Sequence, residues 1–270
     1  MRSVFITGIG GFIGRHAAHA FRNAGWQVDG CDKKSGWRVE DGPYMGIEVI
    51  LHCAANIESL DRRQTGTLEQ FDDIALDRSL LDRLTKFPPD RLIWMSSCVA
   101  AAQDPLDPYS TVKATGEAMA LHFGRVTGVP VHVLRPFSGY GEDQSASYPF
   151  VAIADRAIRR ENPLTVWSDS VRDWVHVDDI CRYILAAANG ELPAGKPIPI
   201  GTGRPTSFTQ LARMFADAVG YKPEISIALD KPAGHPWRVL DERPLLEPTV
   251  SLEEGIKRTV AARSHALSEV

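Results

Sequence analysis

The chain has 270 residues, 44% of them hydrophobic, and carries 30 lysines and arginines against 34 aspartates and glutamates. A net charge of −4 argues against a broad surface for nucleic acid or anionic membrane. Four dispersed cysteines exclude a disulfide scaffold, and no apolar run reaches the roughly 18 residues of a membrane helix. We therefore expect a cytoplasmic protein with no nucleic-acid partner, no membrane partner and no metal site.

Up to residue 200, short runs rich in Val and Ile alternate with helical patterns. Runs that are apolar at nearly every position are typical of strands covered on both faces of a parallel sheet. We predict strands at 3–7, 27–31, 49–54, 91–96, 129–134 and 197–200, and helices at 12–24, 68–85, 108–127 and 178–188. This alternation predicts an α/β fold with a doubly wound parallel sheet.

The pattern loosens after Pro136, where Pro, Gly and Ser cluster. Helices are predicted at 150–160, 207–219 and 251–262. Ser251 and Glu254 open the last of them with a capping-box pattern. We expect these segments to form a smaller lobe over the carboxyl edge of the sheet, where ligands of open α/β sheets bind.

Residues 7–14 read TGIGGFIG and join the first predicted strand to the first helix. Glycines allow a tight turn and a close approach of pyrophosphate to the backbone, and the helix amino terminus offers free N–H groups. Asp32 ends the second strand, where a carboxylate accepts the ribose hydroxyls of NAD and repels the phosphate of NADP. Nearby Arg15, Lys33 and Lys34 would suit NADP instead. A glycine turn without any ligand is the remaining alternative.

Residues 107–113 read DPYSTVK, in which Asp107 and Pro108 predict the start of a helix. Tyr109 then lies in the first helical turn, with Lys113 on the same face. The ammonium group and the positive helix end would lower the tyrosine pKa from about 10 and make it a usable acid and base. Alternatively, Tyr109 is an exposed residue beside a solvated lysine.

Several motifs occur together in one order along the chain. They are 7–14 (TGxxGFIG), Asp32, 52–55 (HxAA), 96–97 (SS), Tyr109 with Lys113, 135–141 (RPxNxYG), 172–179 (RDfvhVdD) and 200–203 (NiGtG). This ordered set resembles the extended short-chain dehydrogenase/reductase family, in its branch of nucleotide-sugar epimerases and dehydratases of the UDP-glucose 4-epimerase type. The resemblance implies a Rossmann-type sheet with a carboxyl-terminal substrate lobe.

The resemblance also implies roles for single residues. Tyr109 would be the general acid and base, Lys113 would lower its pKa, and Ser97 would hydrogen-bond the reacting hydroxyl, with Ser96 as the alternative. NAD would contact Gly8, Gly10, Gly11, Phe12, Ile13, Asp32, Lys33, Ala54, Ala55, Tyr109, Lys113 and Pro136.

The substrate contacts implied by the family are Ser97, Ser138, Arg172 and Arg238. Arginine suits a diphosphate because its planar fork donates to two oxygens. For Arg172, a salt bridge to Asp169 or Asp173 is the alternative. We assign 1–138, with 173–202 returning, to a dinucleotide-binding domain, and 139–172 with 203–270 to the substrate-binding lobe.

The chain also departs from the family pattern. Ala100–Ala102 replace Val-Tyr-Gly, Ser138 replaces an asparagine, and the loop before Tyr109 is short. Segment 33–48 is short as well, which leaves Asp41 as a weak candidate for the adenine contact. Cys98 and Val99 stand where sugar 4,6-dehydratases have an Asp-Glu pair. We therefore set dehydration aside.

The leading hypothesis is an NAD-dependent epimerase of a nucleotide-diphosphate sugar, which oxidises C4 by transient hydride transfer and returns the hydride to the other face. One alternative is an NAD(P)-dependent reductase of a 4-keto sugar or another carbonyl, and another is a non-catalytic dinucleotide sensor. Family resemblance further implies a homodimer through helices 68–85 and 108–127, although the charges of the first helix would equally suit a solvated face.

Overall fold

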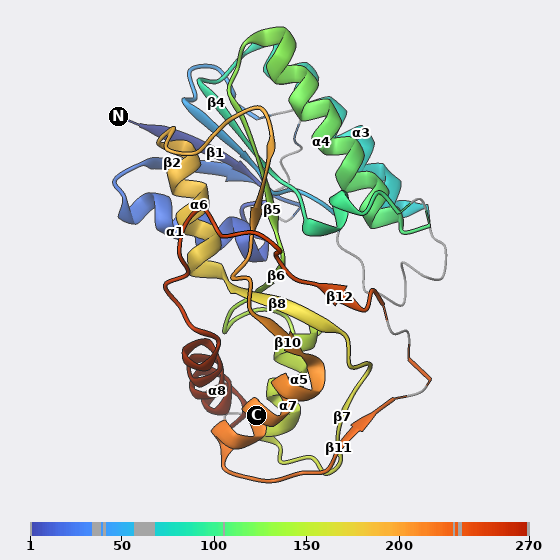
Figure 1. Ribbon diagram of the computed structural model, residues 1–270. Helices are drawn as coiled ribbons and strands as arrows, with labels where there is room; N and C mark the ends of the chain where they lie inside the picture. Colours follow the sequence, from blue (N-terminus) through green and yellow to red (C-terminus); the bar gives the residue numbers. More distant parts are fainter. Residues whose placement is uncertain are drawn as a thin grey trace. The chain divides into compact units, whose positions relative to one another are not determined.

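The computed structural model describes residues 2–33, 39, 42–56, 68–104, 106–228, 230–231 and 234–268, with the backbone alone for 266–268. The chain folds as two compact units (Figure 1). The first unit is Met1–Pro136 with Ile180–Pro199, and the second is Phe137–Asp179 with Ile200–Val270. The chain first passes from one unit to the other after Pro136, close to the domain boundary predicted at residue 138. Assignment of one unit to cofactor and the other to substrate stays a prediction.

A six-stranded sheet in the order β2-β1-β3-β4-β5-β9 forms the centre of the first unit. All pairings from β2 to β5 are parallel, which confirms the predicted α/β class. The strand order reverses between β1 and β3, and open sheets bind ligands beside such a point. The strands are β1 (Ser3–Thr7), β2 (Gln27–Cys31), β3 (Val49–His52), β4 (Arg91–Met95), β5 (Val131–Pro136) and β9 (Pro197–Ile200).

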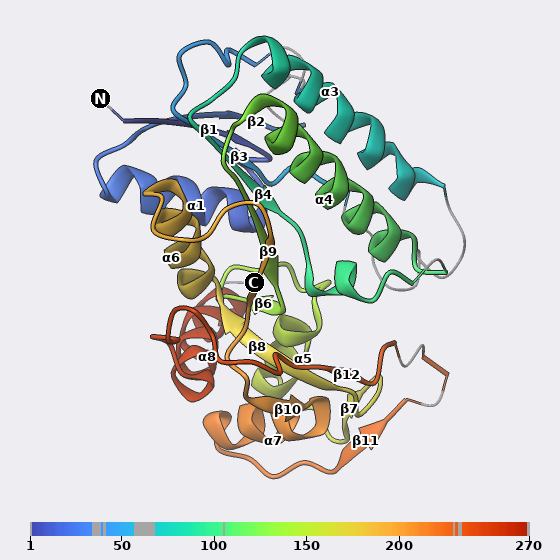
Figure 2. The same cartoon turned by 45° about the horizontal axis from the view of Figure 1, so that its top comes forward.

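Helices cover both faces of this sheet, as a doubly wound fold requires (Figure 2). Helices α3 and α4 lie side by side on one face, and α1 and α6 lie on the other (Figures 1 and 2). All four residues of β3 are buried, as expected for an apolar strand covered twice. The helices are α1 (Phe12–Asn23), α3 (Asp72–Lys86), α4 (Pro108–Thr127) and α6 (Val177–Ala188), with 3-10 helices η2 (Glu69–Phe71) and η3 (Cys98–Ala101).

The helix predicted from residue 68 begins as an α-helix only at Asp72, after η2. The amide of Gln70 and the carboxylate of Asp73 both bind Asn56, so this stretch is committed to a partner outside the helix. By contrast, α4 begins where predicted, because the Asp107 side chain accepts a hydrogen bond from the backbone N–H of Tyr109 and Pro108 follows.

Within the described residues, the second unit contains three helices and two small sheets. Sheet β10-β8-β12, with β6 also paired to β8, packs against α5 and α7, and β11 pairs with β7. Its core is aromatic, with Phe150 between Tyr140, Trp174 and Phe215. The elements are β6 (Ser138–Tyr140), α5 (Pro149–Ile158), β7 (Leu164–Val166), β8 (Val171–His176), β10 (Pro205–Ser207), α7 (Phe208–Val219), β11 (Ile225–Ile227), β12 (Trp237–Arg238) and α8 (Leu252–Ser268).

The capping box predicted at Ser251 forms only in part. Ser251 accepts a hydrogen bond from the backbone N–H of Glu254 at 3.1 Å, but the Glu254 carboxylate pairs with Arg258 one turn further on. A complete box forms instead at the start of α7, between Ser207 and Gln210.

Candidate functional site

The glycine turn after β1 is closely packed. Gly8 has a φ of +73°, and its N–H donates to the carbonyl of Cys31 at 2.7 Å. A Cβ added at Gly8 would lie 2.8 Å from the backbone nitrogen of Ala54, and one at Gly14 would overlap the Gly8 carbonyl. Only glycine fits both positions, so the turn brings backbone N–H groups to the sheet edge without side chains in the way.

Helix α1 starts directly from this turn. Its N-cap is Gly11, no side chain caps the first turn, and that turn contains no acidic residue. A helix amino terminus of this kind attracts a pyrophosphate through its N–H groups and its dipole. The turn and the helix start therefore fit the dinucleotide NAD, and the contacts of Gly10, Gly11, Phe12 and Ile13 with it stay a prediction.

Most of the predicted cofactor residues follow the carboxyl ends of parallel strands. Asp32 follows β2, Ala54 and Ala55 lie just beyond β3, and Pro136 ends β5. A Cβ at Gly10 would meet the Asp32 carboxylate, so that carboxylate lies directly beside the glycine turn. Because parallel strands end at one edge of a sheet, the first unit gathers these residues along a single edge.

Lys33, the cation that complicates a choice between NAD and NADP, donates a hydrogen bond to the side-chain oxygen of Asn56. Asn56 in turn donates from its backbone and side-chain nitrogens to Asp73, at 2.8 Å each. This network holds the Lys33 ammonium at the end of β3. Arg15 lies over the Phe12 ring, 5.3 Å from its centroid. Lys34 and Asp41 lie outside the described residues.

Sequence reasoning missed Asp73, which is only 2% exposed. Burial raises the pKa of its carboxyl, and the hydrogen bonds from Asn56 oppose that rise. The signal was present in the sequence, because Asp73 and Asp77 lie one turn apart among the apolar positions of α3.

A second buried network runs through the HxAA motif. His52 Nε2 lies 2.8 Å from Asp77 Oδ1, and its Nδ1 lies 2.7 Å from Thr7 Oγ1. With the proton on Nε2, the ring donates to Asp77 and accepts from Thr7. The chain of hydrogen bonds joins α3 to the ends of β3 and β1, beside Ala54 and Gly8.

Tyr109 and Lys113 occupy successive turns at the start of α4, and both are half-buried. The Lys113 ammonium lies 5.8 Å from the centroid of the Tyr109 ring. It also donates to the carbonyl of Met95, the last residue of β4, at 3.4 Å. Lys113 is therefore hydrogen-bonded to the end of β4, directly before Ser96 and Ser97.

The two serines after β4 have different surroundings. Ser96 is buried, and its hydroxyl donates to Glu117 of α4. Ser97 is half-buried and caps η3, accepting from the N–H of Val99 at 3.5 Å. Ser96 is thus engaged in a structural contact, which leaves Ser97 as the better candidate for a substrate contact.

Cys53 does not add a nucleophile to this edge. Burial raises the pKa of its thiol, and Cys181 adds to the rise, so the group stays neutral. Among the described residues, no cluster of His, Cys, Asp and Glu is arranged to hold a metal ion.

In the second unit, Arg172 and Arg238 are register partners on the neighbouring parallel strands β8 and β12. Residues paired in this way lie on the same face of a sheet. Arg172 is 9% exposed and lies over the Phe208 ring. Ser138 begins β6 and is the register partner of Trp174, two residues beyond Arg172 on β8. The two arginines predicted from sequence to bind one diphosphate are thus neighbours on adjacent strands.

Asp173 and Asp169, the alternative partners of Arg172, bind other segments. Asp173 is completely buried and accepts hydrogen bonds from the backbone N–H groups of Thr202, Gly203 and Leu240. Asp169 accepts from Thr209 at the start of α7. Asp173, the first aspartate of the RDfvhVdD motif, therefore holds together the segments that contain Thr202 and Leu240.

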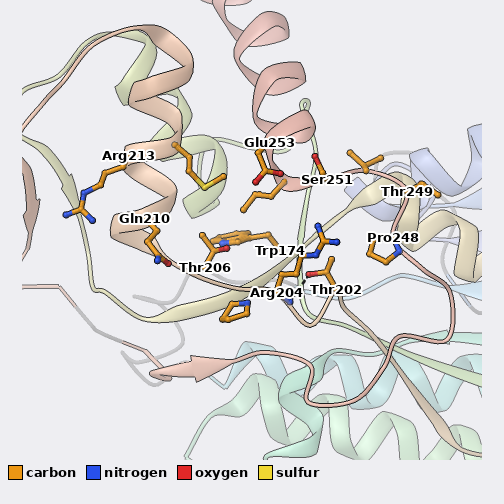
Figure 3. Close-up of a pocket in the computed structure, with 14 residues that line it drawn as sticks. Trp174, Thr202, Arg204, Thr206, Gln210, Arg213, Pro248, Thr249, Ser251 and Glu253 are labelled. Atoms are coloured by element: carbon orange, nitrogen blue, oxygen red, sulfur yellow. Dashed lines mark hydrogen bonds between the residues drawn. The ribbon is translucent and has the colours of Figure 1, made fainter.

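A pocket of about 550 Å³ lies in the second unit, between the first turns of α7 and α8 (Figure 3). Trp174 and Thr206 lie at its centre, Gln210 comes from α7 and Glu253 from α8, and the Arg213 guanidinium points away from the other side chains (Figure 3). Its lining includes none of the three substrate residues proposed for this unit, Ser138, Arg172 and Arg238.

No helix among the described residues combines the length and the apolar character needed to cross a bilayer.

Comparison with known proteins places the chain among related enzymes. The model of the NAD dependent epimerase/dehydratase family matches residues 4–201. A UDP-glucuronate 4-epimerase of Thermodesulfobacterium geofontis is 26% identical over 255 residues, covering 79% of this chain and 72% of that protein.

Two solved structures share the fold over nearly their whole lengths. The UDP-glucose 4-epimerase of Thermotoga maritima with UDP-glucose has a TM-score of 0.85 and 25% identity, covering 98% of this chain and 99% of that chain. The UDP-glucuronic acid 4-epimerase of Bacillus cereus, in complex with UDP-glucuronic acid and NAD, also has a TM-score of 0.85, at 21% identity and the same coverage.

Proposed function

Because the chain belongs to the NAD dependent epimerase/dehydratase family, we propose that it is an NAD-dependent epimerase that inverts C4 of a nucleotide-diphosphate sugar. The observation that carries this proposal is the start of α4. There Tyr109 and Lys113 lie on successive turns, and Lys113 is bonded to the end of the strand that leads into Ser97.

Tyr109 is the general acid and base of the proposed reaction. Its phenolate accepts the proton of the C4 hydroxyl as the sugar is oxidised, and its phenol returns that proton when the sugar is reduced on the other face. The Lys113 ammonium favours the phenolate electrostatically, and the Ser97 hydroxyl hydrogen-bonds the reacting oxygen. When bound, NAD supplies the hydride acceptor and, after the sugar has turned, the donor.

The glycine turn and Asp32 bind the dinucleotide in this proposal. Asp32 lies beside Gly10, where its carboxylate accepts ribose hydroxyls and disfavours a 2′-phosphate. Lys33 is bonded to Asn56, which removes one cation that would favour NADP. We therefore assign NAD as the cofactor.

The diphosphate of the substrate binds Arg172 and Arg238, with Ser138 nearby on β6. Their register pairing places two guanidinium groups on one sheet face, and paired arginines donate to several phosphate oxygens at once. Named relatives act on UDP-glucose and UDP-glucuronate, so UDP-hexoses are the first substrates to test.

Dehydration, the other reaction in the family name, needs a proton-transferring group after the catalytic serine. Cys98 and Val99 occupy those positions here. Valine cannot transfer a proton, and an Asp-Glu pair is absent from this stretch, so epimerisation is the reaction that we propose.

The test is to incubate the purified protein with UDP-, dTDP-, GDP- and CDP-hexoses and to separate C4 epimers by chromatography. Conversion without net consumption of cofactor supports the epimerase. Stoichiometric loss of reduced nicotinamide with a 4-keto sugar would assign a reductase instead, and NAD binding without any turnover would assign a sensor.

We also propose that the protein is a cytoplasmic homodimer, in which α3 and α4 of two copies form a four-helix interface. Light scattering tests the dimer, and a monomer mass at micromolar concentration would refute it.

A further inference from the structure

Glu117 lies one helical turn beyond Lys113 on α4 and is only 4% exposed. Two neighbouring strands supply its partners. Ser96, just after β4, donates its hydroxyl to Oε1, and Arg135 of β5 donates from Nε to the same oxygen at 2.7 Å. A second Arg135 nitrogen donates to Oε2, so the guanidinium holds the carboxylate through both oxygens.

This carboxylate fixes the position of α4 relative to β4. Tyr109, Lys113 and Glu117 are four residues apart and share one face of the helix. Lys113 is bonded to the carbonyl of Met95, and Glu117 is bonded to the next residue, Ser96. Two turns of the helix are thus attached to two consecutive residues of the chain that leads directly into Ser97.

The same contacts control the charge around Lys113. Alone, a glutamate four residues beyond a lysine would attract the ammonium along the helix and away from Tyr109. Arg135 neutralises that carboxylate and satisfies it in a buried position, where an unpaired charge would be costly. Asp73 on α3 and Cys53 after β3 interact electrostatically with Lys113, and Asp77 on α3 lies near Asp73. Asp107 is the N-cap of α4, before Tyr109.

We propose that Glu117, held by Ser96 and balanced by Arg135, is a positioning residue that aligns Ser97 and Lys113 with Tyr109 and sets the proton affinity of Tyr109. This inference rests on the proposed function, in which Tyr109 exchanges a proton with the sugar.

The test removes each charge of the pair in turn. Arg135→Met leaves Glu117 negative, which competes for the Lys113 ammonium and disfavours the phenolate, so the pKa of Tyr109 rises. Glu117→Gln leaves Arg135 positive, which favours the phenolate, so the pKa of Tyr109 falls. We expect shifts of about 0.5 pH unit in opposite directions. The double variant Glu117→Gln/Arg135→Met is expected to return close to the wild-type value.

Two readouts report these shifts. The first is the pH dependence of kcat with a nucleotide sugar. The second is an ultraviolet absorbance titration of phenolate, taken as the difference between each variant and the same variant carrying Tyr109→Phe. The titration requires no turnover. If the wild type converts no sugar, the proposed function fails, while the titration still decides the role of Glu117.

Asp155→Asn is the matched control. Asp155 forms a similar two-oxygen pair with Arg263 in the second unit, so its variant loses a part-buried ion pair of the same kind. We expect a lower melting temperature and no change in the titration of Tyr109. Ser96→Ala changes no charge and is expected to lower kcat several-fold with an unchanged pH profile.

Opposite shifts from the two single variants, with none from Asp155→Asn, support the proposal. Shifts in the same direction, no shift in a folded variant, or a shift in Asp155→Asn as large as in Glu117→Gln would each overturn it.

Discussion

The glycine turn of the first unit and the loops of the second unit are held in different ways. In the first unit, the glycine turn is held by nearby backbone, with Gly8 bonded to Cys31 and Gly11 bonded to Gly8. In the second unit, buried aspartates collect segments from distant parts of the sequence. Asp173 accepts from Thr202 and Leu240, and Asp179 accepts from Thr249 and Val250.

This difference shows where each unit is vulnerable. A backbone turn built from glycines depends on the absence of side chains, and a Cβ added at Gly8 would meet the backbone of Ala54 directly. A buried carboxylate with several N–H partners from separate segments is a shared centre, whose loss leaves several donors unsatisfied together. We therefore expect substitutions in the first unit to affect chemistry, and those in the second to affect loop order and substrate affinity.

The largest effect is expected in the first unit, from Tyr109→Phe. Loss of the phenol removes the proton acceptor and donor, and turnover should fall by about a thousandfold while NAD still binds. Turnover is measured by epimer formation and NAD binding by calorimetry. Tyr221→Phe, which removes a hydroxyl bonded to the Glu161 carbonyl in the second unit, is the control and should keep nearly full activity. Equal losses in both variants would contradict a chemical role for Tyr109.

Asp173→Ala should produce the next largest effect, in the second unit. The variant leaves the N–H groups of Thr202, Gly203 and Leu240 without their acceptor, and we expect a loss of about 3 kcal/mol in the free energy of unfolding. Urea denaturation measures the loss. Exposed Asp217 on α7 supplies the control, Asp217→Ala, which should be close to neutral. A neutral Asp173→Ala would remove the proposed contrast between the units.

Smaller effects are expected from Arg172→Met and Arg238→Met. Each loses charge-assisted hydrogen bonds to phosphate, which should raise the KM for a nucleotide sugar by about 10- to 30-fold and leave NAD affinity unchanged. Arg213→Met is the matched control, because Arg213 is an exposed arginine of the same unit that lines the separate pocket in Figure 3. Should Arg213→Met raise the KM equally, the diphosphate site would have to be moved to that pocket.

The smallest expected effect is on the pH dependence of stability, which should differ between the two units. Burial lowers the pKa of His132 in the first unit from 6.5; its ring lies 3.2 Å from the Pro193 carbonyl. Burial also acts to lower the pKa of His176 in the second unit, but the carboxylates of Asp178 and Glu142, 3.3 and 3.4 Å from its ring nitrogens, outweigh it and raise the pKa to about 9.

The signs of the two contributions are therefore opposite. The pKa of His132 is lower in the folded chain than in the unfolded chain. Below pH 6.5 the unfolded chain therefore binds a proton at His132 more readily, and stability is lost as the pH falls. The contribution of His176 is complete below pH 6.5 and is lost as the pH rises towards about 9. In melting curves from pH 5 to 9, His132→Gln should flatten the acid side and His176→Gln the alkaline side, with exposed His122→Gln changing neither.

Much of the first unit could be predicted from sequence because its signals are local. Apolar runs marked the strands of the central sheet other than β2, which reads QVDGC, and Asp107-Pro108 marked the start of α4. The nearness of Lys113 to Tyr109 follows from helix geometry alone. The predicted strand ends were less accurate. β3 ends at His52, before Ala54 and Ala55, and β4 ends at Met95, before Ser96.

The second unit was less predictable because its contacts are distant in sequence. Its three helices were predicted, but β12 contains only two residues and has no pattern of its own. It is a strand because Arg238 and Trp237 pair with β8. The role of Asp173 depends in the same way on segments that follow it by tens of residues.

The sequence by itself determined the parallel α/β class, the glycine turn and the Tyr109–Lys113 pair, because each depends on neighbours within a strand or a helical turn. Only the tertiary structure decided that Ser96 binds Glu117, that Lys33 is held by Asn56, and that Arg172 lies beside Arg238. The physical reason is that a buried polar group must find a partner wherever the fold brings one within reach, and sequence distance does not limit that choice.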